Sequence, residues 1–86
     1  MNEVINEKVS VMLLYDRMKG CLMPQKMRWQ GKEYRFIKQS YYHRIREGKT
    51  TLHIFHVTDG MMDFRLQCNS ETLHWTLEEV TDGNPC

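Results

Sequence analysis

Apolar and polar residues alternate with a period of two along much of this chain, and no other feature constrains its fold as strongly. A period of two places alternate side chains on opposite faces of a β-strand, whereas an amphipathic helix needs a period near 3.6. The alternation therefore predicts an all-β fold. It is clearest at residues 62–68 and 73–77, where the alternate apolar side chains are Phe64, Leu66, Cys68, Leu73, Trp75 and Leu77.

Turn signals divide this pattern into short strands. Asp59-Gly60 is the strongest signal, because Asp-Gly is favoured in the two-residue turns that join antiparallel strands. The preceding run, residues 50–58, is apolar on both faces, as is typical of a strand at the centre of a sheet. At Ile37 the alternation breaks, which indicates a β-bulge. Further turns are expected at residues 16–20, Gln30-Gly31, Glu47-Gly48 and residues 69–71.

The chain of 86 residues has the length of one domain with a modest core. We expect a single antiparallel β-domain at residues 8–80, between a flexible N-terminus at residues 1–7 and a C-terminal tail at residues 81–86. About six short strands suit a small SH3-like barrel or roll, because closing a sheet removes its exposed edges. The run at residues 8–16 fits either a strand or a helix, and the sequence leaves this choice open.

Nothing in the sequence indicates export or insertion into a membrane. The longest apolar run, residues 11–15, is far shorter than the roughly 18–20 residues that cross a bilayer. The first residues lack the basic and apolar regions of a signal peptide. Because the three cysteines, Cys21, Cys68 and Cys86, are odd in number and widely spaced, they indicate no disulfide framework. We therefore expect a reduced, cytoplasmic protein without a membrane partner.

Charge is concentrated in residues 26–49, which we expect to form a basic, aromatic hairpin. This segment holds eight of the twelve Lys and Arg residues and only two of the eleven Asp and Glu residues. The segment after it is mostly acidic, so the two segments could offset each other across neighbouring strands. The other interpretation is a binding surface, because exposed aromatic rings among cations stack on bases while the cations contact phosphates. Its candidate residues are Arg35, Lys38, Tyr41, Tyr42, His43, Arg44, Arg46 and Lys49.

Two motifs resemble a family of small bacterial β-barrel proteins of unknown function. The first is a Trp-x-Gly-x-x-Tyr hairpin, here Trp29, Gly31 and Tyr34, and the second is a closing Trp-x-Leu strand, here Trp75 and Leu77. The resemblance covers residues 8–80. Some relatives are encoded beside translesion DNA polymerase genes, so the resemblance implies a nucleic-acid partner and a link to DNA repair or replication. It assigns no role to individual residues of this chain.

No arrangement of residues indicates catalysis or metal binding. His53 and His56 are three positions apart, which places them on opposite faces of a regular strand, whereas a structural zinc site needs four converging ligands. Asp59 and Asp63 do not form an acid–base pair, and no nucleophile motif is present. We therefore expect no enzyme activity and no cofactor. The function predicted from the sequence is a binding or adaptor module with a protein partner, and the alternative is binding of single-stranded DNA or RNA through residues 26–49.

Overall fold

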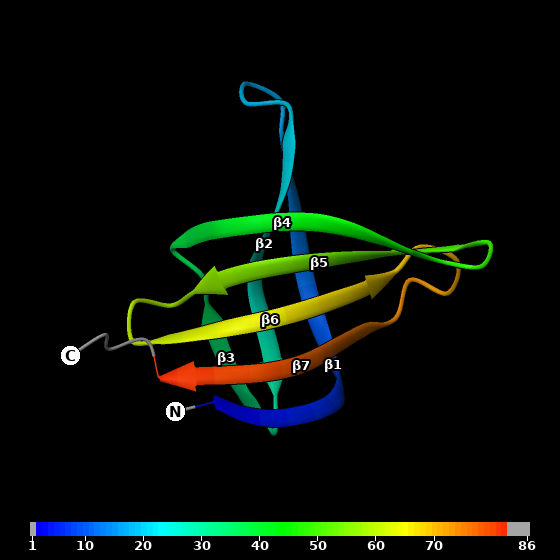
Figure 1. Ribbon diagram of the computed structural model, residues 1–86. Helices are drawn as coiled ribbons and strands as arrows, with labels where there is room; N and C mark the ends of the chain where they lie inside the picture. Colours follow the sequence, from blue (N-terminus) through cyan, green and yellow to red (C-terminus); the bar gives the residue numbers. More distant parts are fainter. Residues whose placement is uncertain (1, 83–86) are drawn as a thin grey trace.

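A computed structural model describes residues 2–82, which form seven antiparallel β-strands in one sheet (Figure 1). These residues contain no helix, and so none that could span a membrane. The all-β, single-domain prediction is confirmed. Residues 8–16, which fit either a strand or a helix, are part of a strand. The strands are β1 (Asn2–Asp16), β2 (Cys21–Trp29), β3 (Lys32–Arg35), β4 (Lys38–Glu47), β5 (Thr50–Thr58), β6 (Met62–Asn69) and β7 (Trp75–Asp82).

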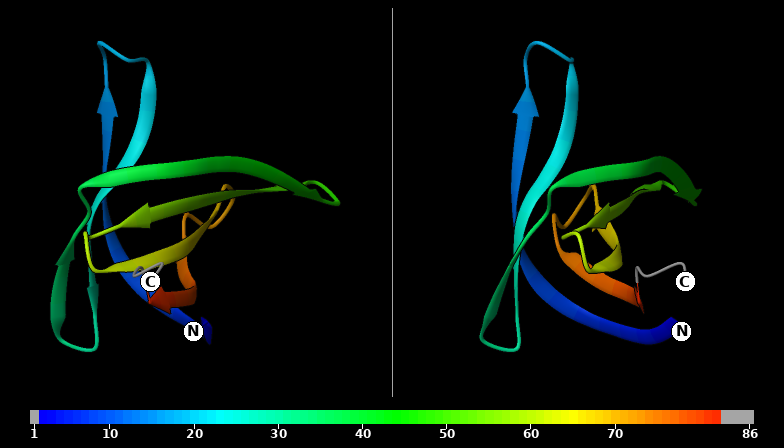
Figure 2. Two further views of the ribbon diagram at one scale, coloured as in Figure 1. Left: turned by 60° about the vertical axis from the view of Figure 1, so that its left-hand side comes forward. Right: turned by 90° about the vertical axis from the view of Figure 1, so that its left-hand side faces the viewer.

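Strand β1 belongs to both halves of the sheet, whose strand order is β3-β2-β1-β7-β6-β5-β4. Its first part, up to Val9, pairs with β7, and its second part, from Ser10, pairs with β2. The register with β7 shifts between Val4 and Glu7, around Asn6, whose φ is 52°. Such an irregularity bends a strand. Strands β4–β7 consequently run across β1–β3 as a second layer (Figure 2).

The segment between β3 and β4 connects the two ends of the sheet. The Phe36 N–H donates to the Gln25 carbonyl of β2, and the Ile37 N–H donates to the Thr58 carbonyl of β5, both at 2.8 Å. The sheet is nevertheless not closed, because β3 and β4 do not pair with each other. The structure thus has seven strands instead of the expected six. Ile37 is not a bulge within one strand but the corner that separates β3 from β4.

The core lies between the two layers, with Phe64 at its centre. The Phe64 ring lies 5.4 Å from the rings of both Tyr34 and Phe36, measured between centroids. The alternation on β6 is confirmed, because Phe64, Leu66 and Cys68 all face this core. Its buried members are Met27, Phe36, Phe55, Val57, Phe64, Leu66, Cys68, Leu77 and Val80.

The two tryptophans lie at the margin of this core. Both are only partly buried, although the alternation predicts burial. The Trp29 ring packs on Tyr34, and its indole N–H donates to the Glu7 carboxylate at 3.1 Å. The Trp75 ring lies 5.4 Å from Phe55 on the other layer. Each indole therefore packs within its own layer, Trp29 in β1–β3 and Trp75 in β4–β7.

The boundaries of the domain also differ from those expected. Strand β1 begins at Asn2, so residues 2–7 are paired with β7 instead of forming a flexible N-terminus. Of the expected tail at residues 81–86, Thr81 and Asp82 belong to β7, and the remaining residues lie outside the described part.

Candidate binding surfaces

The residues of the predicted binding surface come from three elements instead of one hairpin. Arg35 ends β3, the residues from Lys38 to Arg46 lie along β4, and Lys49 lies in the turn to β5. The expectation of one basic hairpin at residues 26–49 is wrong, because the corner at Ile37 takes the chain to the other end of the sheet. There β4 pairs with β5, while β3 pairs with β2.

A register shift between Gln39 and Tyr41 sets which side chains of β4 share a face. Tyr41 is 59% exposed, and its ring lies 5.1 Å from the His43 ring and 5.5 Å from the His56 ring on the outer face of the sheet. Tyr42 points to the opposite face. Its hydroxyl is hydrogen-bonded to Nδ1 of His53 at 2.7 Å, and its ring packs on Phe55. A ligand that lies on one face of the sheet would therefore contact only one of the two tyrosines.

The outer cluster of Tyr41, His43 and His56 continues onto β6 through Arg65. Partial burial lowers the pKa of His56, and the charges of Arg65 and His43 lower it further, while the Glu79 carboxylate opposes this. Arg65 itself lies 2.9 Å from Glu78 and 3.9 Å from Glu79. Acidic and basic side chains are interspersed here, so the electrostatic potential of this cluster is not of a single sign. Within residues 2–82, no three His, Cys, Asp or Glu side chains could hold a metal ion together.

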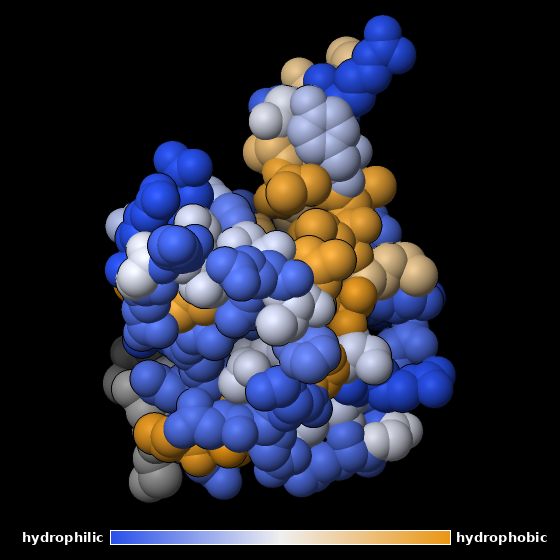
Figure 3. Space-filling view, turned by 90° about the vertical axis from the view of Figure 1, so that its right-hand side faces the viewer, coloured by the Kyte–Doolittle hydropathy of each residue, from blue (hydrophilic) through white to orange (hydrophobic). Residues whose placement is uncertain are grey.

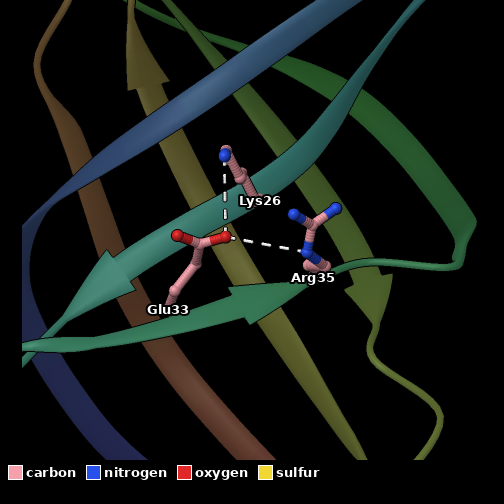
Figure 4. A network of polar contacts seen from close by, with 3 residues as sticks. All are labelled: Lys26, Glu33 and Arg35. Carbon is pink, nitrogen blue, oxygen red and sulfur yellow. Dashed lines mark ion pairs between the residues drawn. The ribbon is translucent and has the colours of Figure 1, made fainter.

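On β2 and β3 the basic charge is partly neutralised within the segment itself. Lys26 and Arg35 are directly opposite in the register, and the Glu33 carboxylate lies 3.5 Å from the Lys26 ammonium and 3.6 Å from Nε of Arg35 (Figure 4). Opposite charges on neighbouring strands stabilise a sheet, whereas two cations placed opposite each other destabilise it. On β4, Lys38, Arg44 and Arg46 are all exposed, and the side chain of Arg35 on β3 is 78% exposed as well.

The structure also reveals a surface that the sequence analysis did not identify. Residues 10–16 of β1 and 21–28 of β2, with the turn between them, form a ribbon that projects from the body (Figures 1 and 2). From Leu13 to Pro24 the ribbon is two-stranded, and nearer the body β3 pairs with β2 as well. Hydrophobic surface extends along this ribbon towards its tip (Figure 3). The exposed large apolar side chains of the ribbon are Met12 (51%), Leu13 (40%), Leu14 (43%), Tyr15 (60%), Met18 (94%) and Leu22 (44%).

The ribbon ends in a turn that is held by specific hydrogen bonds. The Asp16 carboxylate accepts the N–H groups of Met18 at 2.9 Å and Lys19 at 3.2 Å. The Gly20 N–H donates to the Asp16 carbonyl at 2.7 Å, and Gly20 has a φ of 66°, which glycine adopts without strain. These hydrogen bonds define the ribbon as a β-hairpin. Because neighbouring residues of a strand alternate between its two faces, the hairpin presents apolar side chains on both of them.

One sequence signal could have identified this ribbon. Residues 11–15 are apolar without interruption, and a strand of this kind must be covered on both faces to bury its side chains. The described residues cover this ribbon only in part: Pro24 is buried and Val11 packs against the core, whereas residues 12–15 remain exposed. Comparison with known proteins yields no relative: no protein-family model, no curated protein and no solved structure matches this chain.

Proposed function

We propose that this chain is a non-enzymatic protein-binding module and that the ribbon is its contact surface. The observation that carries the proposal is the set of exposed apolar side chains on both faces of the ribbon. Contiguous exposed apolar surface on a soluble domain marks a site of interaction, whereas single exposed apolar residues do not. Protein interfaces favour such a composition at their centre, with Met and Tyr enriched and charged residues depleted.

The free energy available from covering the ribbon supports this proposal. Burying a Leu or Met side chain completely yields about 1.5–3 kcal/mol relative to full exposure. Leu13 and Leu14 are already more than half buried, whereas Met18 is almost fully exposed at 94%. A partner that covers the ribbon gains most at its exposed tip, where Arg17 and Lys19 supply a polar rim.

Site-specific photo-crosslinking tests the proposal in the cells that produce the protein. A benzophenone amino acid in place of Tyr15, which is 60% exposed on the ribbon, should give protein adducts on a denaturing gel. The same amino acid in place of Met61, which is 77% exposed in the turn between β5 and β6, is the matched control and should give far fewer. Equal adduct yields at the two positions, or no adduct at Tyr15, would contradict the proposal.

Nucleic-acid binding by β4 is the second candidate function. The observation in its favour is that Tyr41 is 59% exposed on an edge strand that also exposes Arg44 and Arg46. A ring of this kind can stack on a base while the arginines contact phosphates. Expected support is binding of a labelled single-stranded oligonucleotide that weakens with salt, with a log–log slope of about −0.7 per phosphate contacted.

Substitutions on β4 make this second candidate testable. Replacing both Arg44 and Arg46 by Glu should abolish oligonucleotide binding, because it reverses the charge of the edge without removing a core side chain. Tyr41→Ala should weaken binding and leave the salt slope unchanged, since the ring carries no charge. Tyr42→Phe is the control, because Tyr42 faces the other side of the sheet. Binding that survives the double charge reversal would rule out β4 as the nucleic-acid surface.

A further inference from the structure

The unpaired strand edges of this sheet are not equally protected. Strand edges invite pairing with another strand, and proteins block them with short strands, charges, prolines or bulges. Strand β3 is only four residues long and carries Lys32, Glu33 and Arg35, and β4 carries Lys38, Arg44 and Arg46. The outer edge of β2 in the ribbon contains Pro24, next to a register shift in its pairing with β1. A fourth edge, on β1 from Ser10 on, has no such protection, in contrast to the unpaired side of residues 2–8, which carries Glu3, Glu7 and Lys8.

This fourth edge is the side of β1 that faces away from β2 in the ribbon. Up to Val9, the same side of β1 pairs with β7, whose first residue is Trp75. From Ser10 to Asp16, no strand within residues 2–82 pairs with it. Residues 10–15 contain no Pro, Gly or charged residue, so none of these devices blocks this edge.

We propose that a second copy of this chain covers the edge by adding its own β1 in antiparallel orientation. The proposal rests on the proposed function and names the partner of that same surface. The two ribbons then form one four-stranded sheet, in which the two β1 strands lie at the centre and the two β2 strands, with their Pro24 edges, lie outside. A two-stranded ribbon alone is marginally stable in water, whereas three or more strands with an apolar face can be stable.

The free length of the edge fixes the register of this pairing. Beyond Ser10 the edge is occupied by β7, so the longest self-pairing uses residues 10–16 of both copies and centres on Leu13. Leu13 then faces Leu13 of the second copy across the two-fold axis, Met12 faces its Leu14, and Val11 faces its Tyr15. Paired residues share a face of the sheet in this register, so apolar side chains meet apolar side chains on both faces.

Charge and shape are consistent with the same register. Asp16 of the second copy comes opposite Ser10 and diagonal to Lys8, which lies on the same face of β1, so an acidic group meets a basic one at each end of the pairing. At the same end a groove of about 410 Å³ lies between residues 8–11 of β1 and residues 73–75 at the start of β7, so it overlaps the first positions of the pairing. Val9, Val11, Leu73 and Trp75 contribute apolar side chains to it. The second copy's turn, with the exposed Met18, would extend towards this groove.

The mass of the purified protein in solution tests the association. The chain has a mass of 10.4 kDa, and sedimentation velocity should give twice this value at high protein concentration. Leu13→Asp should return the mass to that of one chain, because it places two carboxylates opposite each other on the two-fold axis. Met61→Asp, at a 77% exposed position outside the ribbon, should keep the doubled mass. A single-chain mass of the unmodified protein at every concentration would overturn the proposal.

Cysteine crosslinking tests the register and does not depend on whether Leu13→Asp folds. Directly opposite residues of an antiparallel pair have Cα atoms about 4.5–5.5 Å apart, within the range for a disulfide. In a chain with Cys21 and Cys86 replaced by Ser, Leu13→Cys should therefore give a disulfide-linked dimer on mild oxidation. Leu14→Cys should crosslink much more slowly, because Leu14 of one copy is only a diagonal neighbour of Leu14 of the second copy, and diagonal neighbours are about 7–8 Å apart. Equal rates at the two positions would contradict this register.

These experiments separate failure of this inference from failure of the proposed function. Heterologous adducts at Tyr15 in cells, together with a single-chain mass in solution, would support a protein-binding ribbon and overturn self-association. A single-chain mass with no adduct at Tyr15 would overturn both. Adducts at Tyr15 of twice the mass of one chain would support both.

Discussion

Phe64 is the largest of the fully buried side chains in the core. It is 1% exposed and contacts the rings of Tyr34 and Phe36, which lie on either side of the end of β3. Phe64→Ala should lower the free energy of unfolding by about 3–5 kcal/mol, because it removes buried surface and leaves a cavity. Urea denaturation measures this loss. Phe64→Leu is the control and should cost less than about 1.5 kcal/mol. Equal losses would show that the ring contacts contribute little.

His56 should make the stability of the domain depend on pH. Partial burial, with the nearby charges of Arg65 and His43, lowers its pKa from the ordinary 6.5. The unfolded chain therefore binds the His56 proton more readily than the folded chain. The stability contributed by neutral His56 is complete above pH 6.5 and decreases as the pH falls from 6.5 towards the lowered folded pKa.

Urea denaturation at a pH above 6.5 and at one about a unit below it tests this dependence. His56→Gln should lose less stability on acidification than the unmodified protein, because glutamine cannot take up the proton. His74→Gln, at an exposed position outside the cluster, is the matched control. Identical pH dependence of the unmodified protein and His56→Gln would contradict the prediction.

At the residue scale, sequence reasoning succeeded where the strands are regular. The period of two on β6 correctly assigns Phe64 and Leu66 to the core, because both neighbouring strands fix its register. It failed for Tyr41 and Tyr42, whose placement on opposite faces depends on the register of β4 against β5. That register shifts at Ser40, and no residue type there indicates an irregularity.

At the element scale, the turn between β2 and β3 offers a prediction of stability. Gln30 and Gly31 both have positive φ, at 52° and 75°, as in the two-residue turns that favour Asn-Gly. Gln30→Asn should therefore raise the free energy of unfolding by about 0.5–1 kcal/mol. Gly31→Ala should lower it by about 1 kcal/mol or more, because its φ is unfavourable for a residue with a Cβ. Thermal denaturation measures both changes, and a stabilising Gly31→Ala would contradict this assignment of the turn.

Local turn signals in the sequence predict most of the turns between strands. Asp59-Gly60 and Gln30-Gly31 lie between strands, as predicted, whereas the turn expected at Glu47-Gly48 is formed one residue later, by Gly48 and Lys49. The Ile37 corner was missed, because a break in alternation looks the same for a bulge and for a strand that changes partners. The ribbon was missed for a related reason. Its apolar pattern is that of a buried strand, and only the pairing of β1 shows that the described residues leave much of it uncovered.

At the scale of the whole molecule, the decisive feature is that one strand serves both halves of the sheet. Strand β1 pairs with β7 over its first part and with β2 over its second. The pairing of β1 with β7 joins the two ends of the chain, and no local pattern in residues 2–9 specifies it. The sequence could therefore give the class of the fold and most of its strands, but not the order of the strands or the open sheet.

The reactivity of Cys68 should report on the opening of the whole sheet. Cys68 lies in β6 between His53 of β5 and Trp75 of β7, and burial raises the pKa of its thiol. Cys21, on the ribbon, is exposed, and both cysteines are free thiols. The expected thiol at Cys86 lies outside the described residues. In a Cys86→Ser chain, a thiol reagent should therefore modify Cys21 at once and Cys68 only when β6 separates from its neighbours.

If this opening requires global unfolding, Cys68 should react at least about 10³-fold more slowly than Cys21, since small domains are stable by about 5 kcal/mol or more. Urea below the unfolding transition should accelerate Cys68 and leave Cys21 nearly unchanged, because only the first rate depends on unfolding. Phe64→Ala should accelerate Cys68 by the factor that corresponds to its loss of stability, which links this measurement to the core. Mass spectrometry of intact protein during labelling follows both rates. A Cys68 rate that does not respond to urea or to Phe64→Ala would show that β6 opens locally, without loss of the sheet.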